Sequence, residues 1–185
     1  MQPGLVERPE DAYLRHGTQG LLANFDGATG EVVAPTIGPS RTEEDFAEHI
    51  AHTIATDPQA PWLFIVDQLN IHKSEALVRL VAKACGIEED LGEKEKRGIL
   101  QSMQTRAAFL SEGSHRIRFL YTPKHTSWLN QIELWFGILV RRLLKRGNFT
   151  SVEDLRERIL AFIAYFNKTM AKPFKWTYKG RPLTV

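Results

Sequence analysis

The sequence predicts an α/β domain in which helices flank a mixed β-sheet, and three observations lead to this fold class. Five apolar residues, 62–66, run directly into Asp67, which is typical of a strand buried on both faces of a sheet. Residues 18–25 and 31–37 flank a turn rich in Asp and Gly and predict a β-hairpin. Apolar residues recur at helical spacing in 42–54, 74–84 and 127–146. The 185 residues are enough for one domain with its own core, spanning 1–185.

The composition is that of an ordinary globular protein rather than a membrane or secreted one. Hydrophobic residues make up 43% and charged residues 25% of the chain. No apolar run approaches the roughly 20 residues that cross a bilayer, so we expect no membrane partner. The N-terminus lacks the apolar core of a signal peptide, and the single cysteine, Cys85, suits a reducing cytoplasm.

The first half of the chain predicts a lead-in, a hairpin and a helix. Pro3, Gly4 and Pro9 argue against helix in residues 1–16. Asp26 stands beside glycines and is interpreted as a turn residue. A helix is expected to begin after Thr42, which has Asp45 three residues on, close to a capping box. His49 and His52 lie on that helix, and we expect both at the surface.

The second half predicts three further helices and one strand. After the helix 74–84, which Gly86 ends, residues 88–114 are highly charged and then show a short helical stripe, so we expect a partly helical excursion that packs on the main body. Residues 116–121 predict a strand. A long helix is expected at about 127–146, with Asn130 and Glu133 on one face, followed by another after Thr150 or Ser151.

The charge is uneven along the chain although the formal net charge is only +2. Residues 1–60 hold three Arg against ten acidic residues, whereas residues 116–148 hold seven Lys and Arg against Glu133 alone. Residues 168–185 form a tail with five Lys and Arg, no acid and interleaved aromatics. This basic C-terminal half of the chain suggests a polyanionic binding partner. The alternative interpretation is a solvated helix face followed by a basic tail.

Two carboxylates stand out against this basic background. Asp67 ends the apolar strand, where ligands gather in open α/β sheets, and Glu133 stands near the start of a helix among apolar residues. A buried carboxylate is costly unless it is paired. The partner could be an Arg or Lys of the fold, or a hard metal ion, which takes carboxylate oxygens.

Two phrases closely resemble the catalytic domain of bacterial insertion-sequence transposases. They are residues 66–72, Val-Asp-Gln-Leu-Asn-Ile-His, and residues 122–136, Thr-Pro-Lys-His-Thr-Ser-Trp-Leu-Asn-Gln-Ile-Glu-Leu-Trp-Phe. The resemblance is to the insertion sequence 630 family, related to the mariner elements, and His16-Gly-Thr and residues 25–30 fit its early hairpin. It covers nearly the whole chain and implies an RNase H-like fold.

The resemblance also implies a chemistry and a set of site residues. The family holds two magnesium or manganese ions with three acids, Asp, Asp and Glu, for strand cleavage and transfer at DNA ends. Asp67 matches the second acid and Glu133 the third, so both are the implied catalytic and metal-binding residues, with Mg²⁺ or Mn²⁺ as cofactor. The implied partners are transposon-end and target DNA and a second copy of the chain, in the bacterial cytoplasm. The supporting residues are Asn70, His72, His125 and Asn130, and the expected DNA contacts are Lys124, Trp128, Arg141, Arg142, Lys145, Arg146, Lys172 and Lys175.

The chain departs from the family pattern in two places. In the family the first Asp lies on the first strand, ahead of the His-Gly-Thr segment, whereas here fifteen residues precede His16 and their acids lie in the lead-in. We therefore expect that the first strand, the first acid and the upstream helix-turn-helix region are missing by N-terminal truncation, and that the chain alone cuts little or no DNA. Sixty-five residues separate Asp67 from Glu133, more than in the mariner pattern, which predicts a helical insertion at 88–114 before the last strand.

Two alternatives remain open from the sequence. The chain could be a non-catalytic DNA-binding or protein-interaction remnant of a transposase, whose binding would be insensitive to divalent ions and to Glu133→Gln. It could also be another nuclease of the same fold that recruits Asp26 or Asp11 as a third ligand, in which case Asp26 would lie within metal-bridging reach of Asp67.

Overall fold

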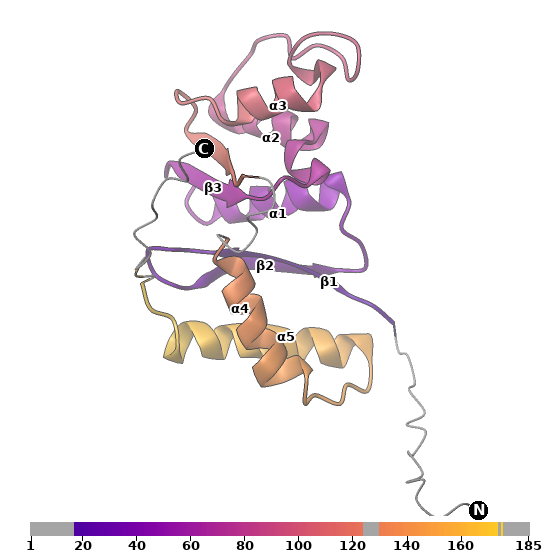
Figure 1. Cartoon of the computed structure of the whole chain (residues 1–185), viewed down its shortest axis with the longest axis vertical. Coiled ribbons are helices and arrows are strands. Elements are labelled where there is room, and N and C mark those ends of the chain that lie inside the picture. Colours follow the sequence, from indigo (N-terminus) through magenta and orange to yellow (C-terminus); the bar gives the residue numbers. More distant parts are fainter. Residues whose placement is uncertain (1–16, 124–129, 174, 176–185) are drawn as a thin grey trace, which may run out of the picture.

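Helices are layered on two small β-sheets in the computed structural model, which describes residues 17–123, 130–173 and 175 (Figure 1). One sheet is antiparallel and the other parallel, which confirms the predicted mixed α/β class. None of the helices in these ranges is long and apolar enough to cross a membrane. The elements, with η1 and η2 as 3₁₀-helices and η4 as a π-helix, are β1 (Gly20–Phe25), β2 (Val32–Gly38), α1 (Glu43–Ala55), β3 (Trp62–Val66), η1 (Asn70–Lys73), α2 (Glu75–Cys85), η2 (Ile99–Gln101), α3 (Met103–Leu110), β4 (Ile117–Tyr121), α4 (Ile132–Leu139), η4 (Val140–Leu144) and α5 (Val152–Thr169).

The hairpin predicted near the N-terminus is present as β1 and β2. The strands run antiparallel, with Phe25 opposite Val32 at the turn. The Asp26 carboxylate accepts hydrogen bonds from the Ala28 amide at 2.8 Å and the Thr29 hydroxyl at 2.9 Å, so Asp26 is the turn residue that the sequence predicts. This place at the hairpin turn does not support the alternative in which Asp26 completes a site with Asp67.

Helix α5 is fixed to the hairpin by one side chain. The Asn167 amide donates from Nδ2 to the Val32 carbonyl and accepts at Oδ1 from the Val32 amide, both at 2.9 Å. It thereby satisfies the backbone of β2 as a neighbouring strand would. Helices α4 and α5 lie together on this side of the hairpin (Figure 1), and Val32, Trp135, Leu139, Ile159, Ile163 and Phe166 form the buried core between them.

The second core lies on the other side of the hairpin, between β3–β4 and helices α1, α2 and α3. Helix α1 contacts both α2 and the hairpin and so joins the two halves of the molecule. Thr42 caps α1 with the expected capping box to Asp45, and Ser74 and Gly86 bound α2. The buried members of this core include Phe46, Ile50, Phe64, Leu77, Val78, Val81, Leu100, Leu110, Ile117 and Phe119.

The described strands form two separate two-stranded sheets instead of one larger sheet. The prediction that β3 is buried on both faces is wrong. Leu63 and Ile65 are 54% and 55% exposed, and Leu120 on β4 is 54% exposed. The reason is that α4 and α5 cover the hairpin and leave the outer face of β3–β4 open. Within the described residues β1 pairs only with β2 and β3 only with β4, so both strands keep one unpaired edge.

The expectation that His49 lies at the surface is also wrong, whereas His52 is exposed as predicted. His49 is 1% exposed and lies between the Asn24 amide, 2.9 Å from Nε2, and the Thr36 hydroxyl, 3.0 Å from Nδ1. Burial lowers the pKa of His49 to about 4, so the ring is neutral at neutral pH. Because the Asn24 Nδ2 group can only donate, Nε2 accepts and Nδ1–H donates to Thr36.

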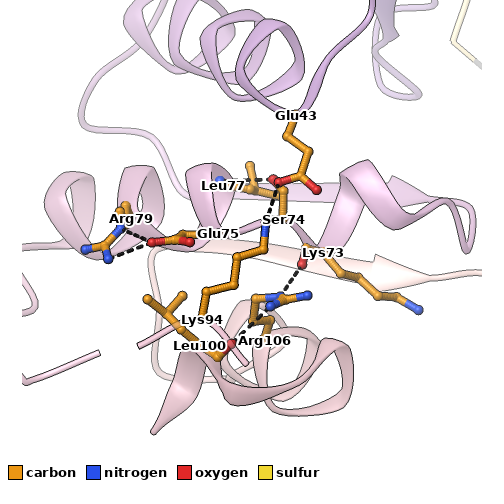
Figure 2. Close-up of polar contacts among 9 residues, drawn as sticks. All are labelled: Glu43, Lys73, Ser74, Glu75, Leu77, Arg79, Lys94, Leu100 and Arg106. Carbon is orange, nitrogen blue, oxygen red and sulfur yellow. Dashed lines mark hydrogen bonds and ion pairs between the residues drawn. The ribbon is translucent and has the colours of Figure 1, made fainter. Parts of the chain in front are cut away.

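Residues 88–114 are partly helical and pack on the main body, as the sequence predicts. Leu100 and Leu110 are fully buried. The guanidinium of Arg106, a residue only 6% exposed, donates to the Lys73 carbonyl at 2.6 Å and to the Leu100 carbonyl at 3.0 Å (Figure 2). This segment is therefore anchored to the turn that ends at Lys73.

The helix expected at about 127–146 differs at both ends. Residues 130 and 131 are not helical and α4 begins at Ile132, with 127–129 outside the described residues. The Asn130 side chain accepts from the Ile132 amide two residues on at 3.3 Å, and the N-cap residue of α4 is Gln131, so Asn130 lies before the helix and does not share a helical face with Glu133. After Leu139 the coil widens into the π-helix η4, which carries Arg141 and Arg142.

Candidate functional site

Asp67 lies where the sequence predicts it, directly after β3. Strands β3 and β4 are parallel with Val66 opposite Tyr121, so their carboxyl ends meet at one edge of the sheet. The chain then turns, and Asp67 Oδ1 accepts a hydrogen bond from the Leu69 amide at 3.0 Å. An Asp side chain that bonds the backbone two residues on stabilises such a turn locally. The 3₁₀-helix η1 follows and returns His72 toward Asp67.

His72 holds the Asp67 carboxylate in place. Its Nδ1 lies 2.8 Å from Asp67 Oδ1 and 3.2 Å from the Asp67 carbonyl oxygen, and its ring packs 4.5 Å from that of Phe46. Burial lowers the pKa of His72, against the opposing effect of Asp67. His72 is therefore neutral at neutral pH, and the contact is a hydrogen bond from Nδ1–H rather than an ion pair. Among the described residues no hydrogen bond or ion pair engages Oδ2 of Asp67, which can therefore serve another partner.

Four further side chains at this edge were not identified from the sequence. Gln68 Nε2 donates to the Thr122 carbonyl at 2.6 Å and joins the ends of β3 and β4, while Lys73 Nζ donates to Gln68 Oε1 at 2.5 Å. The Tyr121 hydroxyl donates to the His72 carbonyl at 2.8 Å, and burial raises the pKa of Tyr121 and keeps it protonated. Arg106 completes the set from α3. The signal available in the sequence for Gln68 and Tyr121 was that both stand at the ends of strands.

The other predicted site residues, Asn70 and Glu133, make fewer contacts than His72 within the described residues. Asn70 begins η1 and is exposed, and no hydrogen bond links its side chain to Asp67 within the described residues. Glu133 is the second residue of α4, close to the helix start as expected. It is exposed rather than buried, so it does not carry the desolvation cost that the sequence suggested. No ion pair engages Glu133 in the part of the chain that the structure describes.

The two carboxylates are chemically suited to a hard divalent ion, although the structure does not gather a full ligand set. Asp67 offers Oδ2 at a half-exposed position, and Glu133 offers both oxygens to solvent. Across the described ranges no three His, Cys, Asp or Glu side chains cluster closely enough to hold a metal. Asp67 and His72 are therefore brought together, and Glu133 is not joined to them by a direct contact.

The expected DNA contacts that fall in described residues are all exposed. Arg141 and Arg142 on η4 and Lys145 and Arg146 after it form a group of four cations, and Lys172 and Lys175 follow α5. None of these six has a carboxylate within ion-pair distance among the residues described. Lys124, His125 and Trp128 lie outside the described residues.

Comparison with known proteins identifies the family. Residues 1–156 match the family model described as DDE superfamily endonuclease, which is most of the chain. No curated protein and no solved structure matches the chain. The match supports a transposase-type nuclease domain, for which DNA is the substrate and divalent metals are the usual cofactors. The chain, with an acid at the carboxyl end of a parallel strand and a second at the start of a later helix, belongs to the DDE superfamily endonucleases.

Proposed function

We propose that this chain is the catalytic domain of a transposase of the insertion sequence 630 type, which cleaves and transfers DNA strands with Mg²⁺ or Mn²⁺. The observation that carries the proposal is the Asp67–His72 pair: the carboxylate is fixed at the sheet edge through Oδ1, and Oδ2 remains available. The family match supports this interpretation, because DDE endonucleases generally use divalent metals, and we assign Asp67 as a metal-binding acid. Glu133 is the proposed second ligand.

We assign separate roles in metal binding, orientation and DNA binding to the residues of this site. Asp67 and Glu133 would hold the metal, which when bound activates a water or a DNA 3′-hydroxyl and stabilises the leaving oxygen. His72 orients Asp67, as carboxylate-binding partners around metal ligands do. The exposed cations Arg141, Arg142, Lys145 and Arg146 would bind the DNA backbone, and such contacts supply affinity rather than sequence specificity.

We further propose that a third carboxylate comes from outside the described residues. The described part of the chain offers two acids for a family that uses three, and β1 and β3 each keep an unpaired edge. A strand pairing with the free edge of β3 would run beside Asp67 and could bring an acid to the same sheet edge. Two acids alone bind one metal weakly, so we expect little strand cleavage without the third.

The test is Mn²⁺ binding followed by nicking of supercoiled DNA. We expect Asp67→Asn and Glu133→Gln each to weaken Mn²⁺ binding about tenfold or more, as loss of a carboxylate ligand does. Glu157→Gln is the matched control, because Glu157 is also exposed on a helix and makes no ion pair. His72→Ala is expected to weaken binding less than Asp67→Asn. Equal Mn²⁺ affinity in all four variants would refute the metal site.

A second candidate function is a DNA-binding module without catalysis. It is favoured by one observation, the absence of a direct contact between Glu133 and the Asp67–His72 pair. This candidate predicts that DNA affinity is the same with Mn²⁺, with EDTA and in Glu133→Gln. Cleavage that requires Mn²⁺ and disappears in Glu133→Gln would exclude it.

The remaining parts of the proposal concern the setting in which the chain works. We propose that it acts in the bacterial cytoplasm on transposon ends and target DNA, and as a homodimer on that DNA. The supporting observations are the match to the DDE endonucleases and the basic surface on η4 and after α5. Sedimentation of the chain with and without a DNA duplex tests the dimer.

A further inference from the structure

The turn that carries His72 and Lys73 is held by two donors from outside it. The Tyr121 hydroxyl donates to the His72 carbonyl at 2.8 Å, and Arg106 Nε donates to the Lys73 carbonyl at 2.6 Å. Tyr121 comes from the end of β4, and Arg106 is buried on α3. Successive carbonyls fixed in this way leave the backbone of the turn little freedom. The Lys73 side chain is therefore presented in a defined direction, and Figure 2 shows it extending away from Arg106.

The Lys73 ammonium is held by neutral partners only. Its Nζ donates to Gln68 Oε1 at 2.5 Å and lies 4.9 Å from the centre of the Tyr121 ring. Among the described residues no carboxylate lies within ion-pair distance of it. A lysine in an ordinary surface ion pair would have its charge balanced, whereas this charge is positioned by a π-face and an amide and is left unbalanced.

The connection that carries this charge also carries the acid of the proposed site. Lys73 lies on the same connection as Asp67, and His72 contacts Asp67 from the adjacent position. A DNA phosphate that approaches Asp67 would be repelled by the carboxylate, and an unbalanced ammonium nearby would offset part of that repulsion. Lysine serves well here because its ammonium is a compact point charge that binds phosphate without a fixed geometry.

We propose that Lys73 binds a phosphate of the DNA substrate beside Asp67, and that Gln68, Tyr121 and Arg106 are the positioning residues that present it. The proposal rests on the proposed function, because it assigns a contact to the same site. It adds a DNA-contacting residue that lies apart from the basic surface on η4 and after α5.

The first experiment measures the binding of a short fluorescein-labelled DNA duplex by anisotropy as salt is raised. Loss of one phosphate contact reduces the magnitude of the slope of log affinity against log salt by about 0.9. A variant that matches wild type at 1 M salt would therefore bind about fivefold more weakly than wild type at 0.15 M. We expect this change in Lys73→Met and a return to the wild-type slope in Lys73→Arg. Lys83→Met is the matched control, since Lys83 is an exposed lysine on α2 that forms no ion pair with any described residue.

The outcomes separate this proposal from the function on which it rests. If the wild type binds DNA and Lys73→Met binds with the same slope as Lys83→Met, the Lys73 contact is refuted while the proposed function stands. If the wild type does not bind DNA, both fail. If Lys73→Met binds weakly but Lys73→Arg does not recover the slope, the role of Lys73 is structural and the proposal is wrong.

A second measurement needs no variant and guards against misfolding of Lys73→Met. The wild-type chain is acetylated on lysine with and without saturating duplex, and modification at each lysine is read by mass spectrometry. We expect DNA to protect Lys73 and to leave Lys83 as reactive as before. Unchanged acetylation of Lys73 under saturating DNA would overturn the proposal.

Discussion

At the scale of single residues, burial separates the described histidines into different roles. His49 and His72 both turn inward, one to the Asn24–Thr36 pair and one to Asp67, whereas His52 faces solvent beside Glu48. The apolar spacing of α1 could have predicted that His49 is buried, because position 49 falls on the buried face of the helix between Phe46 and Ile50. The direction of His72 could not be predicted, because it depends on the 3₁₀ turn that follows Asp67.

The burial of His49 predicts a specific dependence of stability on pH. The pKa of His49 is about 4 in the folded chain against an ordinary value of 6.5 for a solvated histidine, so the unfolded state binds more protons between these pH values. The contribution of the neutral, buried His49 ring to the free energy of unfolding is therefore fully present above about pH 6.5. It decreases as pH falls toward about 4, by up to about 3 kcal/mol. Urea unfolding across this range is expected to show a shallower dependence in His49→Gln than in wild type, whereas His52→Gln should follow wild type. Parallel curves for wild type and His49→Gln would contradict the assignment.

At the scale of elements, local rules of turns and caps predicted more than burial patterns did. The capping box at Thr42, the helix end at Gly86 and the Asp26 turn all follow from residue type at a short distance in sequence, and all are present. The start of α4 was placed too early because the apolar spacing continues upstream of Ile132, whereas Asn130 lies outside the helix and its side chain bonds the Ile132 amide in a local turn.

Gly30 provides a test of the hairpin turn. Its φ is +79°, and a Cβ there would stand 2.0 Å from the Lys172 carbonyl oxygen, so both the backbone angle and the close approach require glycine. We expect Gly30→Ala to destabilise the chain by about 2 kcal/mol in urea unfolding. Gly38→Ala is the control, because a Cβ at Gly38 meets nothing within 4 Å. Equal stability of the two variants would mean that the chain after α5 does not pack on the turn.

Arg106 provides a test of the segment 88–114. Arg106→Met would remove the side-chain donor to the Lys73 carbonyl and one of the donors to the Leu100 carbonyl in a buried place, and we expect a loss of about 3 kcal/mol. Arg79→Met is the comparison: Arg79 pairs with Glu75 on the exposed face of α2 (Figure 2), and its loss should cost less than about 0.5 kcal/mol. Thermal unfolding of the two variants measures the difference, and a small effect of Arg106→Met would show that the segment is held by its apolar residues alone.

At the scale of the whole molecule, the sequence predicted the class of fold but not the division of its sheet. The apolar run 62–66 indicates a strand, and that much is confirmed. Whether its second face is covered depends on where α4 and α5 pack, and these helices come from a part of the chain that is distant in sequence. The location of Asp67 at the end of a strand could likewise be predicted from the pattern of that one strand. The position of Glu133 relative to Asp67 could not, because it depends on the same long-range packing.

The open face of β3–β4 predicts self-association that can be removed without loss of stability. Leu63 and Ile65 are more than half exposed on an edge strand, a combination that favours contact with other chains. We expect Leu63→Thr/Ile65→Thr to change the free energy of unfolding by less than about 0.5 kcal/mol and to reduce association in light scattering at rising concentration. Phe64→Ala, on the buried face of the same strand, should cost about 3 kcal/mol. A large loss of stability in the double variant would show that this face is covered in solution.

The two hydrogen bonds between Asn167 and Val32 join residues 135 positions apart. During synthesis the ribosome adds about 5–20 residues per second, so Asn167 is made roughly 7 to 27 s after Val32. Throughout that interval the apolar side of the hairpin is exposed to every other nascent or folded chain nearby. A chaperone that binds extended apolar segments would find a target at β1 and β2 during this interval, and the need for it there should end once Asn167 has been made.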